Sequence, residues 1–261
     1  MTTMVGEAQV GPMLRSWRER RRFSQQELSN RSTVSTRHLS RVETGRAHPT
    51  PDMILHLAEN LEVPLRERNR LLLAAGYAPR YSERSLDDGS LSVVMDGLRS
   101  LLDAHLPYPA LLLDDYWDVV DTNAAISVLL AGCSPALLEP PVNVIRLCLH
   151  EDGLARQIDN LDQWAGHLHH QAVSRAERTH DPRHHALVAE IVGLYGGTPR
   201  LDPTTGPVLT LRLRTAGGVL RMFSTSAQLT TATDAALEGL RLETFLPADE
   251  ATRGLFSVDP A

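Results

Sequence analysis

Hydrophobic residues recur at helical spacing through residues 1–76, between residues that start and stop helices. Leu39 and Val42, for example, stand three positions apart and therefore share one face of a helix. Gly45 follows them and can adopt the left-handed conformation that ends a helix. The same pattern along the whole segment predicts five short helices, and hence an all-α N-terminal domain.

Two of the predicted helices are joined by a very short connection. Ser24 caps a helix over about residues 25–31, and Glu27 at its third position completes a capping box. Ser35 caps the next helix, which follows directly after the tetrapeptide STVS. Two short helices with such a connection predict a helix-turn-helix, in which the second helix enters the major groove of DNA.

Residues 77–90 show no hydrophobic period and are rich in small and charged residues, so we assign them to a linker. The second domain, residues 91–261, opens with a helix that carries an apolar stripe. A hairpin-like segment follows, and Asn123 is expected to cap the next helix. A long helical region is predicted over about residues 152–195, with a break at Pro182.

The last part of the chain alternates in the manner of strands. The segment VLTLRLR alternates strictly between apolar and polar residues and VLRMFST nearly so, and the TAGG between them favours a tight turn. The segment LEGLRLETFLP reads as a further strand, and a final helix is expected from about Pro247. The C-terminal domain is therefore predicted to be α+β, with a small antiparallel sheet.

Charge is divided between the two domains. The chain carries a net charge of -6, but residues 1–85 hold 14 arginines against 9 acidic residues, a net charge of +5. Residues 86–261 hold 12 arginines against 23 acidic residues, a net charge of -11. A basic N-terminal segment joined to an acidic C-terminal segment favours a polyanionic partner for the N-terminal segment alone.

The block FSQQELSNRSTVSTRHLSRVETGRAHPTPDMILHLAENL resembles the XRE family of phage-repressor-like DNA-binding domains. The resemblance implies that the second helix of the motif reads bases through Thr36, Arg37 and Arg41. It places Ser24, Gln25, Ser40 and Arg46 against DNA phosphates. It makes Arg18 and Glu43 a salt bridge that orients the reading helix. Without the motif, Arg37 and Arg41 would read equally well as the solvated face of a structural helix.

One residue departs from the XRE pattern. Thr33 stands in the turn where the family usually has glycine. A β-branched residue in a left-handed turn costs about 1 kcal/mol or more, so we expect the turn to be slightly altered.

The acidic second domain resembles the C-terminal domain of MmyB-type regulators in the segments PYPALLLDDYWDVVDTNAA, PPVNVIRLCLHEDGL and LEGLRLETFLPADEAT. The segment RNRLLLAAGYAP before the linker is typical of the same group. The resemblance implies a PAS-like fold that binds a ligand between the sheet and its flanking helices. A hydrophobic small molecule such as a fatty acid is the ligand we expect.

Large apolar side chains are the candidates for lining this pocket, because they offer surface to a hydrophobic ligand. They are Tyr108, Leu112, Trp117, Trp164, Phe223 and Phe245. For each of them taken separately, an ordinary core position is the more common role. Arg146 could bind an acidic head group, or could pair with a carboxylate such as that of Glu243 and stabilise the fold.

Six histidines lie within residues 167–185, and pairs such as His180 and His184 could share a helical face. The pattern has no nearby cysteine and is not a zinc-protease motif, so a solvated helix explains it as well as a metal site does. Two cysteines make no disulfide framework, and no apolar run is long enough to span a bilayer, so a cytoplasmic location is expected.

The sequence as a whole predicts a regulator of transcription that binds a double-stranded, palindromic operator as a homodimer. No metal or other cofactor is called for, apart from the hydrophobic ligand. Two alternatives remain open at this point. One is an enzyme recruited to DNA by the first domain, although the common catalytic motifs are missing. The other is a DNA-binding regulator that a protein partner controls.

Overall fold

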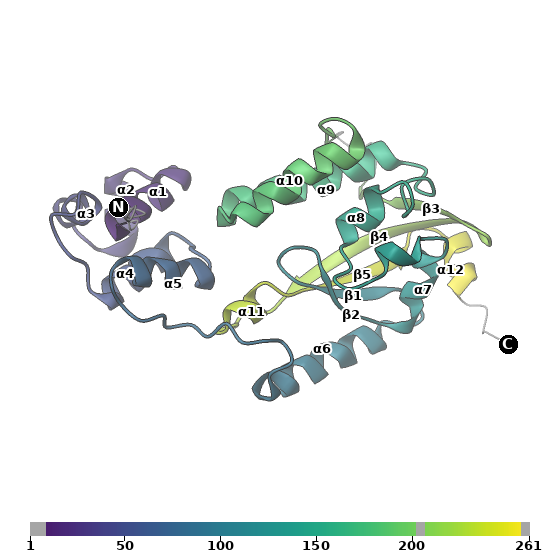
Figure 1. The fold of residues 1–261 in the computed structure, drawn as a ribbon, viewed down its shortest axis with the longest axis horizontal. Helices are drawn as coiled ribbons and strands as arrows, with labels where there is room; N and C mark the ends of the chain where they lie inside the picture. The colour runs from purple at the N-terminus through teal and green to yellow at the C-terminus, as the bar shows by residue number, and fades with distance from the viewer. Residues whose placement is uncertain (1–8, 202–206, 257–261) are drawn as a thin grey trace, which may run out of the picture. The chain divides into compact units, whose positions relative to one another are not determined.

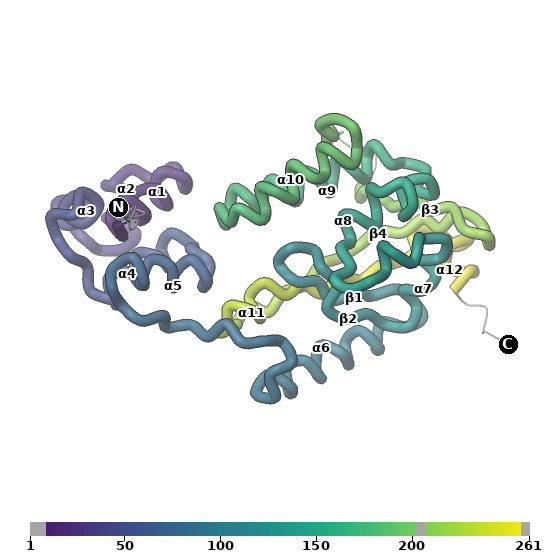
Figure 2. The backbone as a smooth tube through the Cα atoms, in the orientation of Figure 1, coloured from purple at the N-terminus to yellow at the C-terminus, as the bar shows by residue number. Residues whose placement is uncertain are grey.

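The computed structural model describes residues 9–201 and 207–256. The chain divides into two compact units (Figures 1 and 2). The first unit consists of residues up to Arg84 together with Thr231–Glu238, and the second of Ser85–Thr230 with the residues from Gly239 onward. None of the described helices combines the length and the apolar character that crossing a bilayer requires.

Residues 10–74 form the five α-helices that the sequence predicts. They are α1 (Val10–Arg20), α2 (Gln25–Ser32), α3 (Thr36–Glu43), α4 (Pro51–Asn60) and α5 (Leu65–Ala74). The capping box of Ser24 and Glu27 is present at the start of α2, and the Ser35 side chain caps α3. These caps satisfy backbone N–H groups that a helix start leaves free, which explains why such short helices begin where they do.

One core holds the five helices together. Leu14, Trp17, Leu28, Leu39 and Ile54 are each at most 2% exposed and belong to the same cluster. Every one of the helices contributes at least one side chain to it. Helices of 8–11 residues are marginal alone, so this shared burial stabilises the unit.

Thr33 ends α2 in the left-handed conformation, with φ of 57°. Its hydroxyl donates a hydrogen bond of 2.6 Å to the Ser32 carbonyl. The connection between α2 and α3 therefore keeps the backbone that a glycine would adopt, and the side chain bears the strain.

A short segment between two strands of the second unit belongs to the first unit. Residues 231–238 include α11 (Ala235–Glu238). The Leu65 N–H donates to the Glu238 carboxylate at 2.8 Å, and the Ala235 N–H donates to the Ser82 carbonyl at 2.8 Å. These bonds attach the segment to the start of α5 and to the chain that follows α5.

The second unit is built on a five-stranded antiparallel sheet in the order β2-β1-β5-β4-β3. The strands are β1 (Ala110–Leu113), β2 (Val119–Thr122), β3 (Leu211–Thr215), β4 (Gly218–Gln228) and β5 (Arg241–Pro247). Both predicted hairpins and the final strand are confirmed. β5 lies in the middle of the sheet, so side chains on it can reach both halves.

Helices cover the two faces of this sheet unequally (Figure 1). α6 (Ser92–Ala104) contacts β1, β2 and β5 on one face. On the other face lie α8 (Val144–Leu149), α9 (Leu161–Thr179) and α10 (Pro182–Tyr195). The large core cluster is on this second face. Shorter helices are α7 (Ser127–Leu130), α12 (Glu250–Phe256) and the 3-10 turns η1 (Gly89–Leu91), η2 (Ala124–Ile126) and η3 (Pro135–Leu137).

Two local predictions are wrong. The long helical region begins at Leu161 and not near residue 152, because residues 151–157 form turns and Ile158 is bridged to Leu213, whereas its break comes directly before Pro182, as predicted. Asn123 does not cap a helix through its side chain. Its buried amide instead accepts from Ala110 N at 3.1 Å and donates to the carbonyls of Leu102 and Tyr108.

We predict that Thr33→Gly stabilises the first unit by roughly 0.5–1 kcal/mol, because relief of the left-handed strain exceeds the entropy that glycine adds to the unfolded chain. Hydrogen exchange of the α2 and α3 amides in the full-length protein measures the change. Thr44→Gly is the matched control. Thr44 has φ of -91° and bears no such strain, so its replacement should destabilise. Equal effects of both substitutions would contradict the account of the turn.

Candidate functional site

α3 is an amphipathic helix whose polar face is open to solvent. Leu39 and Val42 are each 1% exposed and fix the helix in the core of the first unit. Arg37 and Arg41, one helical turn apart, are exposed on the other face. Thr36 and Ser40 are half-buried beside them. The helix therefore presents two guanidinium groups side by side on a rigid support.

The guanidinium groups of Arg37, Arg41 and Arg46 form no ion pair or hydrogen bond with the residues that the structure describes. All three side chains are exposed. Most other arginines of the unit are engaged: Arg15, Arg66, Arg70 and Arg80 each pair with a carboxylate. Free guanidinium groups on and next to α3 are available to phosphate oxygens and base edges.

Glu43 lies at a junction of three helices. The Arg18 guanidinium of α1 donates two hydrogen bonds to its carboxylate, at 2.6 and 2.9 Å. The Gln25 amide of α2 donates a third, at 2.8 Å. The bond to Glu43 is the main cause of a raised Arg18 pKa. Because Glu43 is the last residue of α3, this junction sets the position of α3 against both neighbouring helices.

Backbone packing supports the same junction. A Cβ atom at Gly11 would lie 2.3 Å from the Val42 carbonyl oxygen, so only glycine lets α1 approach the end of α3 this closely. Ser24 and Gln25, which the XRE resemblance places against phosphates, stand at the N-terminus of α2. Ser24 is exposed there, while the Gln25 side chain is held by Glu43. The Gln25 backbone N–H, rather than its amide, is therefore the group left for an anion.

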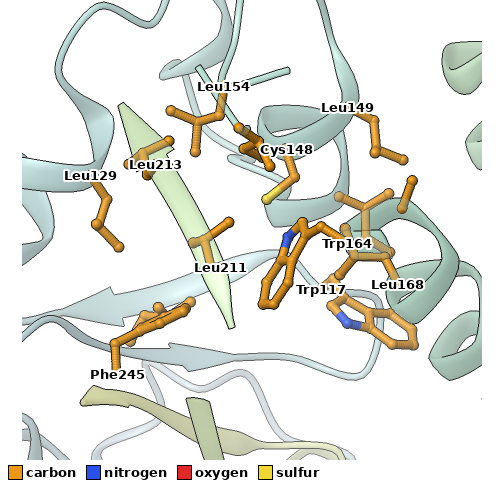
Figure 3. Packing of buried hydrophobic residues seen from close by; sticks show 14 of the residues in the cluster. Trp117, Leu129, Cys148, Leu149, Leu154, Trp164, Leu168, Leu211, Leu213 and Phe245 are labelled. Atoms are coloured by element: carbon orange, nitrogen blue, oxygen red, sulfur yellow. The ribbon is translucent and has the colours of Figure 1, made fainter. Parts of the chain in front are cut away.

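The second unit contains an apolar cavity of about 250 Å3 between α9 and the sheet. Figure 3 shows the large side chains that pack around it, among them Trp117, Trp164, Leu211 and Phe245. Its walls come from β1, β2, β3 and β5, from the segment between β2 and α9, and from α9 itself. The lining residues are Leu111, Trp117, Val119, Thr122, Ile126, Leu129, Leu130, Leu138, Val142, Val144, Leu147, Cys148, Leu154, Trp164, His167, Leu168, Gln171, Leu211, Glu243 and Phe245.

A few polar groups interrupt this apolar wall. Burial raises the pKa of Glu243 and lowers that of His167, so the His167 ring is neutral at pH 7. Gln171 Nε2 lies 2.9 Å from His167 Nε2. Burial also raises the pKa of the Cys148 thiol to about 12, which leaves it without nucleophilic character. The cavity thus has apolar walls and one polar edge, formed by His167, Gln171 and Glu243.

Trp117 reaches the cavity from a strained turn. The Asp114 carboxylate accepts the N–H groups of Tyr116 and Asp118 at 2.8 and 2.9 Å, and closes the loop between β1 and β2. Trp117 within this loop has φ of 65°, yet its side chain is only 2% exposed. A tryptophan in the left-handed region costs about 1–3 kcal/mol, which the burial of its ring offsets.

The structure brings Trp117, Trp164 and Phe245 together at the cavity and separates the other predicted lining residues from it. Leu112 is buried between Leu111 and Leu113 on β1, but alternation points it to the opposite face of the sheet. Phe223 is excluded in the same way, because its neighbour Met222 faces the core. Tyr108 instead contacts Phe256, with 5.5 Å between the ring centroids.

Arg146 does not line the cavity and pairs with a carboxylate, as one of its two readings predicts, but the carboxylate is that of Glu190 and not of Glu243. Its guanidinium donates two hydrogen bonds to Glu190 of α10, at 2.5 and 3.0 Å, and both side chains are partly exposed. Its place on α8 directs it away from Glu243, which lies on the cavity side of β5. Arg146 therefore ties α8 to α10.

Sequence reasoning missed the polar edge of the cavity. His167 and Gln171 stand four residues apart on α9, but their neighbours His169 and His170 made them look like part of a solvated cluster. Nothing in the sequence indicates that Glu243 lines a cavity, because an acidic residue in an alternating strand usually faces water. For the histidine-rich segment, no group of three or more potential metal ligands occurs in the described parts of the chain.

Comparison with known families covers both units. Residues 9–71 match a family described as a helix-turn-helix domain, and residues 94–257 match the MmyB-like transcription regulator ligand binding domain. The matches are to transcription regulator families and not to enzymes. No curated protein matches the chain.

We predict that Glu43→Gln destabilises the first unit by about 3 kcal/mol, because it leaves the Arg18 guanidinium buried without its counter-charge. The rate at which protease cleaves the full-length protein within α1–α3 reports the change, since cleavage follows the open population. Glu83→Gln removes an exposed partner of Arg66, away from Arg18, and should leave that rate unchanged. An equal, small effect of both substitutions would show that the junction does not hold α3.

Proposed function

The chain belongs to the MmyB-like transcription regulators, and from this premise we propose that it binds a palindromic operator as a homodimer and responds to a hydrophobic ligand. It is a helix-turn-helix DNA-binding regulator with an MmyB-like ligand-binding domain. The observation that carries the proposal is that one chain has both unpaired, exposed arginines on α3 and an apolar cavity in its second unit.

On DNA, α3 lies in the major groove. Arg37 and Arg41 project from one face of the helix, and a guanidinium can bond guanine O6 and N7 together. Thr36 at the start of the helix reads a neighbouring base. Ser24, Gln25, Ser40 and Arg46 surround this face and contact phosphates, which fix the register of the helix but carry no sequence information.

Two copies of the chain bind together. One recognition helix of 8 residues touches only a few base pairs, which is too little for specific binding. A dimer that places two such helices about one helical turn of DNA apart doubles the contacts and matches a palindromic site.

The ligand occupies the apolar cavity. An apolar chain that fills a space of about 250 Å3 restores van der Waals contacts that the walls otherwise lack, so an apolar occupant stabilises the unit. A single hydrocarbon chain, such as that of a fatty acid, fits walls of this kind.

The ligand signal has a covalent route to the DNA-binding unit. β5 carries Glu243 and Phe245 of the cavity wall, and residues 231–238 precede this strand. That segment is hydrogen-bonded to Leu65 and Ser82 in the first unit. A ligand that moves β5 therefore pulls on α5, and this changes the presentation of the two recognition helices in the dimer.

We predict that Arg37→Ala weakens specific operator binding by ~1–3 kcal/mol and relaxes the preference at one base pair. Arg46→Ala should weaken all sequences alike and flatten the salt dependence by about one unit. Arg70→Ala, which removes an arginine already paired with Glu67, is the control. Fluorescence anisotropy with operator variants at several salt concentrations distinguishes the two roles. If both variants lose specificity equally, the division of roles is wrong.

We predict that a hydrophobic compound extracts with the purified protein into organic solvent, in an amount that Leu129→Trp reduces. The indole fills cavity space that the compound occupies. Leu129→Met, with nearly the same volume, should extract as much as the natural protein. Mass spectrometry of the extracts measures both. Equal recovery from the two variants would place the compound elsewhere.

A further inference from the structure

A second hollow, of about 670 Å3, continues the apolar cavity along α9 and β5 and is open to solvent. Its walls are polar and carry the guanidinium groups of Arg175, Arg178 and Arg241. Gln171 lines both hollows. The two spaces therefore adjoin at Gln171, and we call them together the trough, with an apolar end and a basic end.

The periodicity of both walls explains this arrangement. On β5, Phe245 and Glu243 face the cavity, and Arg241 is the next residue on the same face, because strand side chains alternate. Arg241 thus lies roughly 13 Å from Phe245 along the strand. On α9, Arg175 and Arg178 follow Gln171 at intervals of four and seven residues, which keeps them on the same side of the helix.

In this trough, Arg241 has a buried side-chain N–H group that lacks a hydrogen-bond acceptor among the described residues. Its guanidinium stacks on the Trp117 ring, 4.4 Å from the ring centroid, and Trp117 is also a wall of the apolar cavity. Its Nη2 atom is buried and has no hydrogen-bond partner among the residues that the structure describes. A buried cationic N–H group without an acceptor is unfavourable, so this group favours an external oxygen.

The charged residues around Arg241 do not exclude an external anion. Arg175 is already paired with Asp115. Arg178 has no carboxylate within ion-pair distance in the described chain, and neither has Arg241. Asp114 and Glu243 act on Arg241 only through space. Two guanidinium groups thus face the hollow without an ion-pair partner among the residues that the structure describes.

We propose that Arg178 and Arg241 form an oxyanion site that takes a carboxylate or a phosphate at the open end of the trough. The oxyanion is either the acidic head group of a ligand whose chain lies in the apolar cavity, or a free small anion. The inference extends the proposed function, because it adds a charged end to the cavity and makes the preferred ligand an amphipathic acid.

Calorimetric titration of the full-length protein with decanoate, decanol and inorganic phosphate tests the site. If the head group is the source, decanoate binds more tightly than decanol. Arg241→Gln then weakens decanoate about tenfold, the loss of a charge-assisted bond, and the exposed Arg178→Gln weakens it two- to fivefold. Neither variant changes decanol binding, and Arg156→Gln, an exposed arginine of the same unit, changes none of the ligands.

If a free anion is the source, phosphate binds alone and Arg241→Gln and Arg178→Gln abolish or weaken it, while decanoate and decanol bind alike. The proposal is overturned if decanoate and phosphate bind the natural protein and both variants equally, or if phosphate does not bind and decanoate shows no advantage over decanol. Failure of decanoate and decanol to bind at all would contradict the hydrophobic ligand instead, and the phosphate titration would still decide the arginine site.

Discussion

The apolar cavity between α9 and the sheet is the constraint on which the second unit depends. Protein interiors are packed as densely as organic crystals, and a space of about 250 Å3 lined by leucine, valine and aromatic side chains departs from that rule. Water gains little there, because the wall offers few hydrogen-bond partners. Under the proposed function, a hydrophobic ligand in this cavity and the fold stabilise each other, since a ligand that binds only the folded state adds its binding free energy to the stability.

The same elements that build the cavity also connect it with charge and with the DNA-binding unit. β5 is central in the sheet and carries cavity residues on one face, with Arg241 beyond them. Its N-terminal end continues from the segment that is hydrogen-bonded to α5. In the first unit, Glu43 joins three helices at the end of α3. In the proposed mechanism, a small movement of β5 acts through this segment on a helix group that one buried carboxylate holds in a fixed arrangement.

Local signals in the sequence predict the first unit almost completely. α2 and α3 begin after Ser24 and Ser35, whose side chains make the expected caps, and Arg37 and Arg41 are exposed where amphipathic spacing puts them. The second unit is less readable, since its cavity is assembled from strands far apart in the chain. Only when the strand register is known does alternation show that Leu112 and Phe223 lie on the face of the sheet opposite the cavity. That Glu243 and Arg241 line hollows is apparent only when α9 is placed over β5.

The affinity of the full-length protein for its operator, measured before and after hydrophobic compounds are stripped from it, tests the central claim most directly. If the cavity is the sensor, stripping changes that affinity by about fivefold or more, which is the lower range of measured coupling between sites. Returning the extracted compound should restore the original value. An operator affinity that is the same with and without the compound would contradict the account.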